Sequence, residues 1–260
     1  FLNPTAHHIA AWPHPEPKAD AGIDFRHYIE LAQAAEAAKF DLIFLADGVG
    51  TRGDNVDFLS RTAHSYQAQF EPITLLSALA AVTQRIGLVA TASTSFNEPY
   101  HIARKFASLD HISGGRAAWN LDTSSSPHEA RNFNREEHSA HADRYERAGE
   151  FADVVAGLWN SWEDDAFERD KAGGRFYDPD KRHVLHHRGK HFSVQGPLNV
   201  SRPPQGHPVV VQAGSSEAGR ELAARTAEAV FTAQQTLGDA VAFYADIKGR
   251  MERFGRDPDH

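Results

Sequence analysis

Residues 40–48 read FDLIFLADG, a continuous apolar run that ends in an aspartate and a glycine. A strand with one face in water alternates apolar and polar residues, so an unbroken run predicts a strand buried on both faces. Such strands occur in parallel sheets whose connections are helices. The run therefore predicts an α/β fold.

The same pattern continues on both sides of this run. Further buried strands are predicted at residues 86–92, 116–123, 208–213 and 229–233, with a clipped strand at the start of the chain. Helical spacing of apolar residues predicts helices that begin near residues 24, 72, 99, 140, 216 and 238. Residues 49–70 are expected to form a long loop, and residues 163–206 a polar excursion with a hairpin.

About six strand–helix alternations fit either an open doubly wound sheet or a closed barrel. The first strand is not followed by Gly-x-Gly-x-x-Gly, which removes the usual dinucleotide-binding signature. The 260 residues fit one large domain. Both ends of the chain look cut, because it opens without methionine and closes just past a helix.

Composition excludes several classes of function. The net charge of −8 disfavours nucleic acid and anionic membranes as partners. The absence of cysteine excludes disulfides, thiolate metal sites and cysteine nucleophiles. Since neither a membrane span nor a signal peptide is visible, we expect a cytoplasmic protein.

Polar residues gather where the predicted strands end, which in a barrel is the active-site face. The second strand ends in Asp47, the third contains Thr91 and the fourth contains Asn120. Small hydroxyls and amides of this kind can hydrogen-bond a polar ring. Asp47 is equally compatible with an ordinary Asp-Gly turn.

Two further patterns are candidates for binding a phosphate. Gly214, Ser215 and Ser216 join a strand to a helix start, where free N–H groups favour an anion, although Ser216 also suits a plain helix cap. His141 and Tyr145 stand four residues apart on one helix face and can both donate hydrogen bonds, or can simply be a surface pair.

The 16 histidines do not form a recognisable metal motif. Adjacent pairs such as His186 and His187 point to opposite faces of a strand, and His-Glu-x-x-His is absent. We expect the histidines of the polar excursion to be mostly solvated, and we predict no metal site.

An ordered set of motifs resembles one family along the whole chain. The motifs are NPTAHH at residues 3–8, FDLIFLADG at 40–48, SGGR with WN at 113–120, EARNF at 129–133, HADRYERA at 141–148 and QAG at 212–214. The chain resembles bacterial-luciferase-like flavin monooxygenases, in the branch of nitrilotriacetate monooxygenase component A and dibenzothiophene-sulfone monooxygenase.

This resemblance implies a (β/α)₈ TIM barrel whose C-terminal strands are missing from this chain. It implies a two-component enzyme that takes reduced FMN from a separate NAD(P)H:flavin reductase and oxidises a small N- or S-containing compound with O₂, for example in xenobiotic degradation. Relatives suggest a homo-oligomer. His7 and Phe44 match positions near the reaction centre. The FMN contacts implied by the resemblance are Asp47, Thr91, Asn120, His141, Tyr145, Gly214, Ser215 and Ser216.

Three departures from the family pattern lie on the substrate side of the rim: Asp122 in place of an aliphatic residue, the segment 125–127, and Ala6 in place of a common glycine. The substrate is therefore left open. Alternatives are a deazaflavin-dependent hydride-transfer enzyme, a metal-dependent hydrolase and a non-catalytic flavin-binding barrel.

Overall fold

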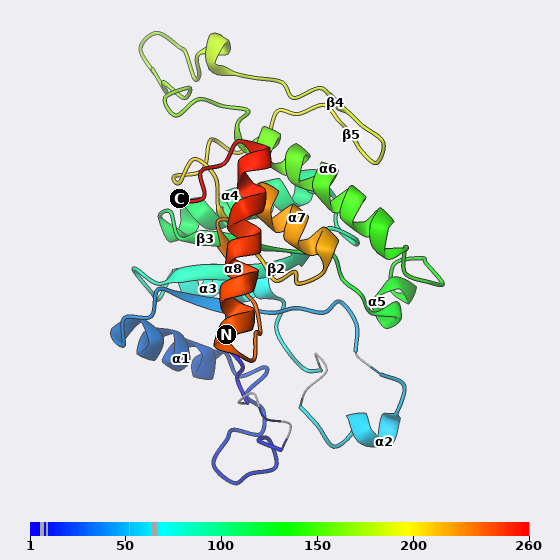
Figure 1. Ribbon diagram of the computed structural model, residues 1–260. Coiled ribbons are helices and arrows are strands. Elements are labelled where there is room, and N and C mark those ends of the chain that lie inside the picture. The colour runs from blue at the N-terminus through cyan, green and yellow to red at the C-terminus, as the bar shows by residue number, and fades with distance from the viewer. Residues whose placement is uncertain (6–7, 9, 52, 64–66, 260) are drawn as a thin grey trace.

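The computed structural model in Figure 1 describes residues 1–5, 8, 10–51, 53–63 and 67–259. Its centre is a parallel five-stranded sheet in the order β1-β2-β3-β6-β7. The strands are β1 (Leu42–Leu45), β2 (Gly87–Ser93), β3 (Ala117–Asp122), β6 (Val209–Gln212) and β7 (Ala229–Val230). Each new strand joins the same side of the sheet, whereas a doubly wound sheet reverses its order. The predicted fold, a partial (β/α)₈ barrel, is thus confirmed.

Helices connect the strands, and most begin at residues that sequence rules favour. Pro72 occupies the first turn of α3, and Gly114 ends α4 in the left-handed conformation, with φ 68°. The helices are α1 (Phe25–Ala37), α2 (Val56–Leu59), α3 (Pro72–Ala80), α4 (Pro99–Ser113), α5 (Pro127–Arg131), α6 (His141–Trp159), α7 (Glu217–Thr226) and α8 (Leu237–Met251), with short 3₁₀ turns η1 (Pro179–Lys181) and η2 (Glu252–Phe254).

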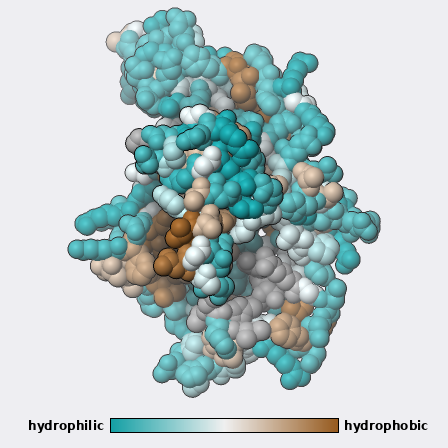
Figure 2. Space-filling view, in the orientation of Figure 1, coloured by the Kyte–Doolittle hydropathy of each residue, from teal (hydrophilic) through white to brown (hydrophobic). Residues whose placement is uncertain are grey.

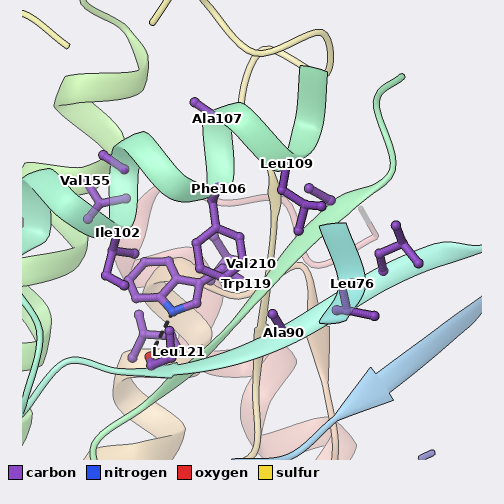
Figure 3. Close-up of a cluster of buried hydrophobic side chains, with 14 of the residues drawn as sticks. Leu76, Ala90, Ile102, Phe106, Ala107, Leu109, Trp119, Leu121, Val155 and Val210 are labelled. Atoms are coloured by element: carbon purple, nitrogen blue, oxygen red, sulfur yellow. Dashed lines mark hydrogen bonds between the residues drawn. The ribbon is translucent and has the colours of Figure 1, made fainter. Parts of the chain in front are cut away.

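Alternate residues of each strand divide the sheet into two packed faces. Trp119 of β3 faces the helices, where it packs on Phe106 of α4 and donates a hydrogen bond from its indole Nε1 to the carbonyl of Ala92 at 3.0 Å (Figure 3). The opposite face carries a small apolar layer made of Phe44, Val89, Ala118 and Val211. Residues two positions further along these strands therefore face the same inner side, at the carboxyl ends of the strands.

The excursion protrudes from the barrel and contains the hairpin predicted for it, formed by β4 (His187–Arg188) and β5 (Ser193–Val194). Its protruding part is mainly hydrophilic (Figure 2). The prediction that its histidines are mostly solvated is wrong for two of them. His187 lies 2.9 Å from a carboxylate oxygen of Glu150, and Nε2 of His191 is buried. The Glu150 carboxylate of α6 also accepts hydrogen bonds from the backbone N–H groups of residues 191 and 192. These contacts pack the hairpin against α6 and largely remove the two histidines from solvent.

Three other predictions differ from the structure. No strand is assigned among residues 1–5, although the Leu2 N–H donates to the Phe44 carbonyl at 2.8 Å, beside β1. The predicted loop 49–70 contains the short helix α2, because Asn55 caps it by accepting the Phe58 N–H. The helix that begins near residue 140, which the apolar spacing extends to about residue 162, ends at Trp159.

No helix among the described residues combines the length and the apolar character that crossing a membrane requires.

Candidate functional site

A cavity of about 160 Å³ lies at the carboxyl ends of the strands, on the inner side of the sheet. It brings together Phe44, Asp47, Thr91 and Asn120, which come from three neighbouring strands and the turn after β1. The described residues that line it are Phe1, Phe44, Ala46, Asp47, Thr91, Asn120, Asp122, Ser124, Ser125, Glu129, Ala213 and Phe231.

Thr91 and Asn120 line this cavity and form a buried hydrogen-bond relay, in which Thr91 bonds both to Asn120 and to the Leu45 carbonyl. They are paired in the register of β2 and β3, and each is 5% exposed. The Thr91 hydroxyl donates to the Leu45 carbonyl at 2.8 Å and accepts the Asn120 Nδ2–H at 2.9 Å. Asn120 Oδ1 is buried and has no hydrogen-bond partner in the part of the chain that the structure describes. A buried acceptor without a partner is costly, so this oxygen is suited to a donor supplied by a ligand.

Asp47 has an unusual electrostatic environment. Burial raises the pKa of its carboxyl group to about 6, opposed by the hydrogen bond from the Gly48 N–H and reinforced by three acidic neighbours, Glu71, Glu129 and Asp122. Burial likewise raises the pKa of Asp122. Carboxyl groups with raised pKa values in a cavity are typical of functional sites.

Phe44 supplies an aromatic wall to the same cavity. Its ring stacks on Phe1 at 5.5 Å and on Phe231 at 6.1 Å between centroids. Phe231 was not among the predicted site residues. The available signal was its spacing, because it follows Ala229 by two positions and therefore faces the same side.

A second group of predicted residues gathers at the start of α7. Ser216 caps this helix by accepting the Gly219 N–H at 3.1 Å. A Cβ atom added to Gly219 would lie 3.1 Å from the Tyr145 hydroxyl, 3.1 Å from Ser216 Oγ and 3.0 Å from the Gly214 Cα. A Cβ atom would therefore crowd these neighbours, and two hydroxyl groups lie beside a helix N-terminus, an arrangement that suits an anion.

The positions of the remaining predicted site residues support a binding role less strongly. The ring of His141 lies 4.7 Å from that of Tyr145, on the exposed start of α6, and Ser215 is exposed beside Ser216. Tyr145 and Ser216 are not among the residues that line the 160 Å³ cavity, so the predicted residues form two groups. His7 lies outside the described residues.

No group of three or more histidine, aspartate or glutamate side chains in the described ranges has the arrangement of a metal site.

The family and curated relatives agree with the resemblance seen in the sequence. The model of the luciferase-like monooxygenase family matches residues 5–260. N-acetyl-S-(2-succino)cysteine monooxygenase of Bacillus subtilis (strain 168) is 54% identical over 100% of the chain, and nitrilotriacetate monooxygenase component A of Aminobacter aminovorans is 52% identical over 97%. Dibenzothiophene-sulfone monooxygenase of Rhodococcus erythropolis is 45% identical over 97%. The chain spans 57%, 57% and 56% of these relatives.

Solved structures give the same result for the fold. A long-chain alkane monooxygenase matches with a TM-score of 0.91 at 40% identity, covering 97% of this chain and 59% of that one. A riboflavin lyase solved with modified FMN and riboflavin matches with a TM-score of 0.89 at 36% identity, covering 95% of this chain and 56% of that one. The chain belongs to the luciferase-like monooxygenase family, as its sequence motifs predicted.

Proposed function

We propose that this chain is the N-terminal part of an FMN-dependent two-component monooxygenase, which oxidises a small organic N- or S-containing compound with reduced FMN and O₂. The observation that carries the proposal is the convergence of Asp47, Thr91 and Asn120 on one cavity, with a buried acceptor on Asn120 that has no partner among the described residues. The names of the relatives support the reaction class.

The residues of the site fit a flavin nucleotide. Asn120 Oδ1 and the Asp47 carboxyl group can accept hydrogen bonds from ring N–H groups, and Phe44 offers an aromatic surface. The group around Gly219 would hold the phosphate: Tyr145 and Ser216 at short range, with His141, Gly214 and Ser215 beside them. The riboflavin lyase solved with modified FMN supports a flavin of this type.

Reduced FMN, when bound, supplies the electrons that activate O₂. The chain's own tasks are to orient the ring, to exclude water and to control protons. Phe44, Phe1 and Phe231 pack together and make one wall of the cavity apolar. Asp47, whose raised pKa lies near neutrality, can hold or release a proton at its carboxyl oxygens. His7 remains a proposed acid or base.

A separate NAD(P)H:flavin reductase is proposed as the source of reduced FMN. The name "component A" of the Aminobacter aminovorans relative supports a second component. A homo-oligomer and a cytoplasmic location are part of the same proposal.

The test has two steps. Anaerobic titration with reduced FMN is expected to show saturable binding that Asn120→Ala weakens and the control Asp41→Asn leaves unchanged, because Asp41 is exposed at the opposite end of β1. Thioethers and tertiary amines are then supplied with ¹⁸O₂ and a flavin reductase, and products are read by mass spectrometry. Incorporation of one labelled oxygen is expected. Absence of reduced-FMN binding, or formation of hydrogen peroxide alone with every compound, contradicts the proposal.

A further inference from the structure

Arg147 belongs to the motif at residues 141–148, of which the proposed function uses only His141 and Tyr145. It lies on α6, two residues after Tyr145, and its side chain points in a different direction, because residues i and i+2 do not share a helix face. Tyr145 lies against Gly219 at the start of α7, whereas Arg147 reaches the backbone of Thr94, just beyond the end of β2. One turn of α6 is thus connected to two different parts of the site.

The guanidinium group of Arg147 is partly buried and is held on several sides. One of its N–H groups donates a hydrogen bond to the Thr94 carbonyl. Its Cζ lies 4.5 Å from the ring centroid of Phe192, in the turn of the β4–β5 hairpin, and 5.8 Å from that of Phe151. A cation attracts an aromatic face, and more strongly when the cation is desolvated. The carbonyl and the two rings therefore fix the orientation of this planar group, which a lysine ammonium group would not reproduce.

Thr94 is in turn bonded to the wall of the cavity. Its backbone N–H and its hydroxyl group both donate to the Asp122 carbonyl, at 2.8 and 3.0 Å. The neighbouring residues of the same two turns are also joined, because the Ser124 hydroxyl donates to Ser93 Oγ at 2.8 Å. Asp122 and Ser124 both line the cavity. Arg147, which is not among the described lining residues, is therefore connected to the cavity wall through Thr94.

The first two turns of α6 are packed less firmly than the rest of this helix. No residue from 141 to 147 is buried, and the first buried side chain of α6 is that of Ala148. Because burial decreases toward this end, apolar packing constrains its position less than that of the middle of the helix. The hydrogen bond from Arg147 to Thr94 joins this end of α6 to the ends of the strands.

The proposed flavin nucleotide has to reach two separate groups of residues. Its ring would occupy the cavity at the ends of β2 and β3, and its phosphate would contact the group around Gly219, which includes Tyr145. A ligand that binds at two places gains affinity only when the distance between the places matches its own length. The attachment of α6 to the end of β2 sets part of this distance.

We propose that Arg147 is a positioning residue, which holds Tyr145 and the rest of the phosphate-binding group at the distance from the ring cavity that a flavin nucleotide requires. The inference rests on the proposed function and deepens the description of that same site. Arg147 acts through α6 and Thr94, without contacting the flavin. Loss of its guanidinium group is expected to leave each of the two binding places intact and to misalign one with the other.

Three probes separate the two binding places. Reduced riboflavin tests the ring cavity, inorganic phosphate tests the phosphate-binding group, and reduced FMN requires both. The affinities for the two flavins are measured by anaerobic titration, and the affinity for inorganic phosphate is measured by its competition with reduced FMN.

Two variants separate the orientation of Arg147 from its charge. Arg147→Met removes both, whereas Arg147→Lys keeps the charge and loses the planar guanidinium group. In both variants the affinity for reduced FMN is expected to fall about tenfold or more, while those for riboflavin and inorganic phosphate stay within about twofold of the wild-type values. Arg104→Met makes the same replacement at an exposed arginine of α4 and is expected to retain all three affinities.

Failure of the positioning role is distinct from failure of the proposed function. If the wild-type protein binds neither reduced flavin, the proposed function is contradicted. If it binds them, the positioning role is overturned by wild-type affinity for reduced FMN in either Arg147 variant. An equal loss of riboflavin affinity would overturn it by indicating general damage to the fold, and a loss of phosphate affinity would do so by indicating a direct contact. Absence of competition by inorganic phosphate in the wild type would overturn it as well.

Discussion

Replacing Asp47 with asparagine is expected to stabilise the protein at neutral and alkaline pH and to lose this effect in acid. Burial raises the pKa of the Asp47 carboxyl group from 3.8 to about 6. The folded state therefore binds this proton more tightly than the unfolded state. The stability that the protonated group contributes is complete below pH 3.8, falls as the pH rises, and is lost above about pH 6.

The size of the effect follows from the same shift. A rise from 3.8 to about 6 is roughly two pH units, and each unit corresponds to 1.36 kcal/mol, which gives about 3 kcal/mol as an upper value. Asp47 is partly exposed, so solvent screening reduces this to about 1–3 kcal/mol. Asparagine carries no charge and avoids this cost at every pH.

The assay is urea unfolding of the wild-type and Asp47→Asn proteins at several pH values from 4 to 8, followed by circular dichroism. The free energy of unfolding of the variant should exceed that of the wild type by about 1–3 kcal/mol at pH 8, with the difference shrinking toward pH 4. The control Asp41→Asn, exposed at the start of β1, should show no such trend. A difference that is constant with pH, or that grows in acid, would refute the reasoning.

Three further predictions concern the relay, the phosphate group and the hairpin. Thr91→Val should cost about 1–3 kcal/mol in urea unfolding, because the Leu45 carbonyl and the Asn120 amide both lose their partner, and should weaken reduced-FMN binding; unchanged values of both would contradict the relay. Gly219→Ala should weaken the binding of reduced FMN more than that of reduced riboflavin in anaerobic titrations, since its Cβ would crowd the hydroxyl groups proposed to hold the phosphate. Burial alone would raise the pKa of Glu150, but hydrogen bonds from His187 and two backbone N–H groups lower it to about 2. The stability that this carboxylate contributes to the folded state is therefore present above pH 4.5 and is lost as the pH falls toward 2. Glu150→Gln should therefore speed limited proteolysis of the β4–β5 hairpin at pH 7, and wild-type cleavage rates in the variant would rule this out.

Much of the fold was predictable from the sequence, because its signals are local. The apolar run at 40–48 specifies a strand buried on both faces, and Pro72 and Gly114 mark the beginning of one helix and the end of another. Short elements were not predicted, because they contain too few residues to show a local pattern. Helix α2 has one turn and no buried residue, so no periodic pattern marks it.

The choice between the two architectures needed the strand order. Both a barrel and a doubly wound sheet read as alternating strands and helices, and periodicity does not record which strands are neighbours. The family motifs favoured the barrel, and the pairing of β1 to β2 to β3 to β6 to β7 confirmed it.

The features of the site also fall into those that the sequence determines and those that only the tertiary structure determines. The sequence by itself determined the family and the polar residues at the strand ends, since strand periodicity and motif spacing are properties of neighbouring residues. Only the tertiary structure decided that Asn120 lines the cavity and keeps a buried oxygen without a partner among the described residues, that Asp122 lines the same cavity, and that Tyr145 lies against Gly219. These relations join segments that are distant in the chain, and they depend on strand register and helix packing, which a linear pattern does not encode.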